Sequence, residues 1–208
     1  VLERGQAFWR WIESSLGLPD LLPRHSSHGT LGYRKILTLP GVVLPINIIG
    51  LDTSWLAGDE SDSGNLIVTT HQLMTLLSRK DGSPLIGTRI VLMHHPIFDL
   101  FDRTVIQSLL SERADLVLRG HLHEPQAGAW LEPDQKRLPQ LAAGCLYDGY
   151  QASKYPNGCQ VLTLTIDASG KIKECQVHFR TWSARGHWYS DNSLYRSLNE
   201  GKLVWPLD

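Results

Sequence analysis

Cysteine is scarce in this chain, and so are long apolar runs and an excess of charge of either sign. The three cysteines, Cys145, Cys159 and Cys175, form neither a Cys-x-x-Cys pair nor a disulfide framework, which favours a reducing, cytoplasmic setting. No apolar run is long enough to cross a bilayer and no secretory signal opens the sequence, so we expect no membrane association. A formal net charge of -1 disfavours a strongly basic nucleic-acid surface.

The pattern of apolar residues predicts an α/β domain. A chain of 208 residues with 42% apolar content is long enough for a substantial core. Short apolar runs at 90–93 and 115–119 predict strands, and apolar residues at helical spacing across 104–113 predict a helix between them. Strand, helix and strand of this length fit a βαβ unit, whose two strands run parallel. Both strands then end at one sheet edge, where open α/β sheets usually hold their ligands.

The remaining chain extends this unit on both sides. We expect helices at 8–16 and 69–78 before or beside it, and mostly β structure after it. Further strands are expected at 35–39, 43–51, 128–131, 138–143, 159–167 and 171–182. This pattern predicts a sandwich of two mixed β-sheets flanked by helices. Residues 1–182 would form the domain, and 183–208 an aromatic tail packed on it, with 203–207 as an extended segment lying against a neighbour.

Histidines follow both strands of the βαβ unit, as His-His-Pro at 94–96 and Gly-His-Leu-His at 120–123. Neutral imidazole binds transition metals through either ring nitrogen, and a glycine before a ligand lets the backbone turn sharply. On an extended segment, His121 and His123 would point to the same side and reach one metal ion or two adjacent ones. Either motif alone is commonly an ordinary loop. Their occurrence at the ends of consecutive strands predicts a metal site.

With their flanking strands, these motifs resemble the last two metal-binding motifs of the calcineurin-like metallophosphoesterases. The matching residues are Val-Leu-Met-His-His-Pro at 91–96 and Val-Leu-Arg-Gly-His-Leu-His at 117–123, with weaker similarity at 48–55 and 141–144. The resemblance implies that His94 and His121 bind one ion and His123 the other. It places His95 beside the substrate or behind the ligands. Tyr147 is a candidate substrate contact, with an ordinary surface tyrosine as the equal alternative.

The same resemblance implies two divalent transition-metal ions, Mn, Fe, Zn or Ni, and hydrolysis of a phosphomonoester or phosphodiester bound between them. The histidine content agrees, because imidazole favours transition metals over magnesium and calcium.

The family's earlier motifs are absent, since neither Asp-x-His nor Gly-Asn-His occurs in the chain. These motifs would supply a bridging carboxylate, further ligands and the usual acid, so the catalytic residues stay unassigned. We therefore expect an N-terminal half of the domain elsewhere, on the same or a separate chain, and little activity from this chain alone. Gly-Asp-x-x-Asp does occur at 58–62, but in a polar run typical of a solvated loop, and we assign neither Asp59 nor Asp62 as a ligand. His25 and His28 are likewise expected to be loop residues.

Three functions remain open. The first is metal-dependent phosphoester hydrolysis by the intact protein. The second is a catalytically incomplete module that keeps the fold to bind a partner. The third is a nuclease with the same metal chemistry, which the near-neutral charge disfavours.

Overall fold

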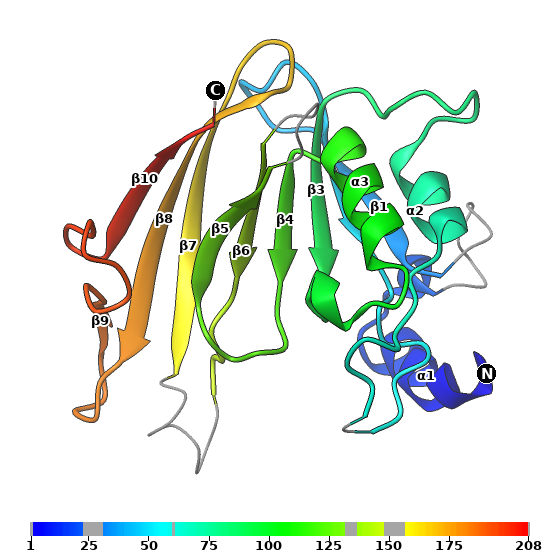
Figure 1. The fold of residues 1–208 in the computed structure, drawn as a ribbon, viewed down its shortest axis with the longest axis horizontal. Coiled ribbons are helices and arrows are strands. Elements are labelled where there is room, and N and C mark those ends of the chain that lie inside the picture. The colour runs from blue at the N-terminus through cyan, green and yellow to red at the C-terminus, as the bar shows by residue number, and fades with distance from the viewer. Residues whose placement is uncertain (1, 23–30, 60, 132–136, 148–156, 208) are drawn as a thin grey trace.

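The computed structural model describes residues 2–22, 31–59, 61–131, 137–147 and 157–207, so His25 and His28 lie outside the described residues. Two β-sheets pack face to face, and helices cover the outer face of the larger sheet (Figure 1). The fold class expected from the sequence, an α/β sandwich of two sheets flanked by helices, is confirmed. Every helix in these ranges is too short or too polar to cross a lipid bilayer.

The first sheet has six strands in the order β1-β2-β3-β4-β6-β5. They are β1 (Tyr33–Leu37), β2 (Ile46–Gly50), β3 (Thr88–Met93), β4 (Leu116–Arg119), β5 (Gln126–Trp130) and β6 (Leu138–Ala142). The four central strands, β2, β3, β4 and β6, run parallel, and β1 and β5 run antiparallel at the two edges. The βαβ unit predicted from the sequence is therefore confirmed, and its strands end at one edge.

The second sheet contains β7 (Gly158–Ile166), β8 (Ile172–Trp182), β9 (Trp188–Ser190) and β10 (Lys202–Pro206). Its order is β10-β8-β7, with β9 also paired to β8, and the pairs among these described strands are antiparallel. The aromatic tail thus supplies two strands of this sheet, because an extended segment satisfies its backbone groups by pairing with β8.

The described part of the chain also contains three α-helices, α1 (Gln6–Ser15), α2 (Thr70–Leu77) and α3 (Arg103–Arg113). Short 3₁₀ turns occur at Leu2–Gly5, Pro19–Leu21 and Ile97–Asp99. Helices α2 and α3 lie on the outer face of the first sheet, whereas α1 lies near the arrowhead end of β3 (Figure 1).

Two apolar cores explain why these segments adopt this arrangement. Residues such as Val91 and Val117 point from the sheet toward α2 and α3, while Ile90 and Leu116 point toward the second sheet. β3 and β4 are therefore apolar on both faces, as expected of parallel strands covered on both sides.

An ion pair sets the register of the two strands that carry the histidines. The backbone N–H and Nε of Arg89 both donate to Asp115 Oδ2, at 2.9 and 2.8 Å, and Arg89 Nη2 donates to Oδ1 at 3.0 Å. This bidentate pair joins the start of β3 to the residue just before β4, and geometry of this kind is the most specific that arginine offers. The two strands therefore begin level with each other, and their C-terminal ends lie side by side.

Candidate metal centre

The C-terminal ends of β2, β3 and β4 bring together residues from three loops. His94 and His95 follow β3, and His121 follows β4. One ring nitrogen from each of these three histidines lies within 4.8 Å of the other two, a spacing that permits a shared metal ion. Sequence analysis expected His94 and His121 to meet here, and the structure brings them together.

The Gly-His-Leu-His segment is not extended. His121 has a φ of 76° and His123 a φ of 59°, so both residues adopt the left-handed conformation and the chain turns back on itself. The alternation of side chains that would put His121 and His123 on the same side therefore does not apply. His123 lies outside the three-histidine group, although its charge acts on His94. Its assignment as a ligand stays a prediction.

Gly120 joins the two histidine loops. Its N–H donates to the carbonyl oxygen of His94 at 3.2 Å. A Cβ at this position would lie 3.4 Å from Nδ1 of His94, at the near limit of van der Waals contact. The second loop therefore lies directly against the imidazole of the first.

Thr53, in the loop after β2, fixes the position of His95. Its Oγ1 shares a hydrogen bond of 2.9 Å with Nδ1 of His95 and accepts the His95 backbone N–H at 3.2 Å. His95 is only 7% exposed, so these contacts hold a buried ring whose Nε2 is left for the cluster. His94 is more exposed, and its Nε2 lies 3.2 Å from Nδ1 of His121.

The electrostatic environment keeps the imidazoles of His94 and His95 in the form that binds metals. Burial lowers the pKa of His94 and of His95, and neighbouring histidines lower both further by charge repulsion. Rings with a lowered pKa are neutral at physiological pH, which leaves ring lone pairs available for coordination. A set of neutral imidazoles fits zinc, manganese, iron or nickel.

Asp99 is a carboxylate beside this group that sequence reasoning did not identify. It lies in the 3₁₀ turn after Pro96, is 5% exposed, and places Oδ2 3.9 Å from Nε2 of His121. The Ser63 hydroxyl donates to its other oxygen at 2.6 Å. A carboxylate facing the outer nitrogen of a metal-binding histidine is a common way of orienting the ring. The one signal in the sequence is an acid within the apolar run Ile-Phe-Asp-Leu-Phe.

Arg119, the last residue of β4, interacts electrostatically with Asp99. Burial lowers the pKa of its guanidinium, and the nearby Asp99 carboxylate opposes that effect. Its Nη2 donates to Oε1 of Gln126 at 2.7 Å. The guanidinium thus adds positive charge behind the second histidine loop.

The remaining residues considered from the sequence are not members of the three-histidine group. Tyr147 leaves the same sheet edge after β6, but its side chain is 80% exposed. Asp59 accepts hydrogen bonds from the backbone and hydroxyl of Ser61, and Asp62 accepts from the N–H of Gly58. These local bonds describe a self-contained turn, consistent with the solvated loop expected there.

Comparisons with known proteins supply little beyond this geometry. No protein-family model matches the chain, and no curated protein matches it. Among solved structures, it is similar to Vps29 from Chaetomium thermophilum, with 8% identity, a TM-score of 0.32 and coverage of 84% of this chain and 61% of that one. It is also similar to a conserved uncharacterized protein, a predicted phosphoesterase, from Streptococcus pneumoniae, with 18% identity, a TM-score of 0.27 and coverage of 76% and 62%. The chain thus spans less than two thirds of either structure, and similarity this low carries no argument about function.

Proposed function

We propose that the intact protein is a metal-dependent hydrolase of phosphate esters, and that His94, His121 and His123 hold two divalent transition-metal ions. The observation that carries the proposal is the convergence of three imidazoles from consecutive parallel strands at the C-terminal edge of the sheet. Sheet edges of this kind are where α/β proteins usually bind ligands.

Such ions, when bound, neutralise phosphate charge and lower the pKa of water towards neutrality, which supplies a nucleophile at physiological pH. The residues of this chain would hold and orient them. Thr53 keeps the His95 ring in one orientation beside the ligands, and the Asp99 carboxylate faces the outer nitrogen of His121. His95 and Tyr147 are the proposed substrate contacts.

Three histidines do not complete a site for two ions, and no acidic residue joins the group in the described part of the chain. We propose that the other ligands and the acid come from an N-terminal half of the domain, on the same or a separate chain. The working protein would be cytoplasmic and its partner a phosphate ester, with nucleic acid as the less favoured substrate.

The incomplete ligand set favours one alternative, a module that keeps the fold to bind a partner without catalysis. The two readings differ in metal binding and turnover. The test is titration of the full-length protein with Mn²⁺ by calorimetry, followed by assay with bis(4-nitrophenyl) phosphate and 4-nitrophenyl phosphate.

Saturable Mn²⁺ binding with turnover that a chelator abolishes is the expected result. Metal binding without turnover of either ester would favour the partner-binding module. No metal binding at all would overturn the metal centre itself.

A further inference from the structure

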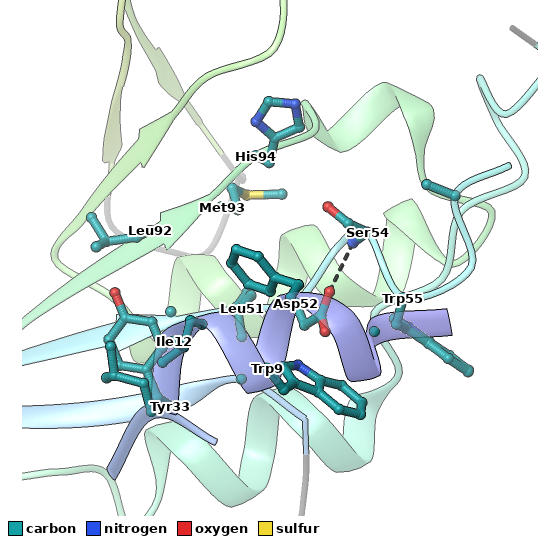
Figure 2. Close-up of a pocket in the computed structure, with 16 residues that line it drawn as sticks. Trp9, Ile12, Tyr33, Leu51, Asp52, Ser54, Trp55, Leu92, Met93 and His94 are labelled. Carbon is teal, nitrogen blue, oxygen red and sulfur yellow. Dashed lines mark hydrogen bonds between the residues drawn. The ribbon is translucent and has the colours of Figure 1, made fainter. Parts of the chain in front are cut away.

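A cavity of about 720 Å³ adjoins the histidine group on the side of α1. It lies between that helix and the C-terminal ends of β2 and β3, and His94 belongs both to its lining and to the histidine group (Figure 2). The volume is in the range of pockets that bind small molecules. A ligand with one end at the histidines would therefore have its other end in this cavity.

Four aromatic side chains from three separate segments line the cavity, Phe8, Trp9, Tyr33 and Trp55. Two of them are in close contact with neighbouring backbone. Trp55 Nε1 donates to the carbonyl oxygen of Ile67 at 2.6 Å, and a Cβ at Gly5 would lie 2.7 Å from the Trp9 ring. The close contacts of the rings with neighbouring backbone give the cavity walls a defined shape.

Buried apolar residues complete the walls, among them Ile12, Leu51 and Met93. Aromatic and aliphatic walls favour a flat apolar group, because such a group buries its surface against them without losing hydrogen bonds to water.

The cavity also contains one acidic group, Asp52, whose carboxyl lies between Trp9 and Trp55 (Figure 2). One oxygen accepts the N–H of Ser54 at 2.9 Å. Burial raises the pKa of this carboxyl, as expected for a charge partly removed from water. The backbone N–H groups of Ser54 and Trp55 both donate to this carboxyl. Because a carboxylate has about four lone-pair sites, a ligand hydroxyl or amine could donate to it as well.

We propose that this cavity binds the organic group of the phosphate ester, an aromatic ring that carries a hydrogen-bond donor for Asp52. The proposal rests on the proposed function for the position of the phosphate, at the histidines next to the cavity. The cavity itself selects the ring.

Two probes separate the cavity from the metal centre. The first is 2-naphthol, an aromatic donor without phosphate, compared with 2-methoxynaphthalene, which has no donor. The second is 2-naphthylmethylphosphonate, which carries the same ring and an anionic group that hydrolysis does not remove. Binding of each to the full-length protein is measured by calorimetry, with and without Mn²⁺.

Four variants accompany the wild type. Trp9→Ala removes a wall, and Trp9→Phe keeps an aromatic ring there. Trp11→Ala is the matched control, because Trp11 lies on the same helix, is 49% exposed and does not line the cavity. Asp52→Asn keeps the shape of the acidic residue and removes its charge. Circular dichroism checks that each variant is folded.

We expect Trp9→Ala to weaken 2-naphthol binding about tenfold or more, because the ring loses an aromatic surface on which to pack. Trp9→Phe and Trp11→Ala should stay within about threefold of wild type. Asp52→Asn should reduce the preference for 2-naphthol over 2-methoxynaphthalene. Equal losses in Trp9→Ala and Trp11→Ala, or no 2-naphthol binding at millimolar concentration, would overturn the proposal.

The phosphonate distinguishes failure of the cavity from failure of the metal centre. Mn²⁺ should increase its affinity at least about tenfold, and His121→Ala should remove that gain without changing 2-naphthol binding. If 2-naphthol behaves as expected but Mn²⁺ adds nothing, the proposed function is overturned and the ligand class of the cavity stands. If Mn²⁺ acts but Trp9→Ala has no effect, the cavity proposal fails and the metal centre stands.

Discussion

The loops after β3 and β4 both present histidines at the same sheet edge, but they are held there differently. In the first, His95 is buried and bonded to Thr53, so the core fixes its position. In the second, His121 and His123 both have positive φ, which costs a non-glycine residue about 1–2 kcal/mol. Backbone strain of this kind concentrates at functional sites. The first loop is therefore anchored to the core through His95, whereas the second keeps two residues in a strained backbone conformation.

The largest effect should come from removing His94 or His121, because these two histidines belong both to the proposed ligand set and to the three-histidine group. His94→Ala and His121→Ala are each expected to lower Mn²⁺ affinity by more than about 100-fold. Losing a metal ligand should weaken binding more than losing a residue that only orients a ligand. Calorimetric titration of the full-length protein measures this. His71→Ala, which alters an exposed histidine on α2, is the control and should bind as wild type does. Retained affinity in both ligand variants would contradict the metal centre.

A second pair of variants decides which histidine is the third ligand. We expect His123→Ala to lower Mn²⁺ affinity about tenfold more than His95→Ala, as the ligand assignment requires. The same titration is used for both. If His95→Ala matches His94→Ala while His123→Ala has little effect, the three clustered imidazoles are the ligands and His95 has been assigned the wrong role.

Thr53→Val tests whether the core fixes the first loop. The substitution removes the hydroxyl bonded to His95 and leaves buried polar groups unpaired, so the free energy of unfolding should fall by about 1–3 kcal/mol. Urea denaturation of the metal-free protein is the measurement. Thr163→Val, at an exposed position of β7, is the control and should stay within about 0.5 kcal/mol. Equal stability of the two variants would mean that Thr53 does not hold the loop.

Asp99→Asn tests whether the Asp99 carboxylate orients His121 in the second loop. The amide keeps the size of the side chain but loses the charge facing His121, and Mn²⁺ affinity should fall about tenfold. Ser63→Ala, which removes a donor to the other oxygen of Asp99, should have a smaller effect on affinity. Unchanged affinity in Asp99→Asn, with the variant folded, would rule out a role in orienting His121.

The smallest effect is expected from relieving the backbone strain at His123. His123→Gly should raise the free energy of unfolding of the metal-free protein by about 0.5–1 kcal/mol, because glycine adopts positive φ without steric cost but loses more chain entropy. Urea denaturation against wild type measures the change. A loss of stability would show that contacts of the His123 side chain outweigh the strain.

Much of the fold follows from local patterns that the sequence displays openly. The apolar runs at 90–93 and 115–119 predicted β3 and β4 to within a few residues, and apolar residues at helical spacing across 104–113 predicted α3. Such runs are decisive because strands buried on both faces admit few polar residues. The tail was harder to place, since its short strands β9 and β10 are defined by pairing with β8 rather than by their own pattern.

The site was also only partly predictable, because part of it depends on contacts between segments rather than on a pattern within one segment. The meeting of His94 and His121 follows from parallel strands ending level. The turn at His121 and His123 does not, because positive φ in a histidine is not visible in the residue type. Asp99 and Thr53 come from segments with no motif, and they reach the histidines only through the packing of loops.

By itself the sequence determined the α/β class, the parallel pair of strands in the βαβ unit and the edge at which two histidine motifs emerge, since these depend on apolar periodicity and chain connectivity. Only the tertiary structure decided which imidazoles lie within 4.8 Å of one another and what supports them. It alone placed α1 beside His94 and so created the aromatic cavity. Contacts between segments far apart in the chain depend on how faces pack, and packing is a property of the folded whole.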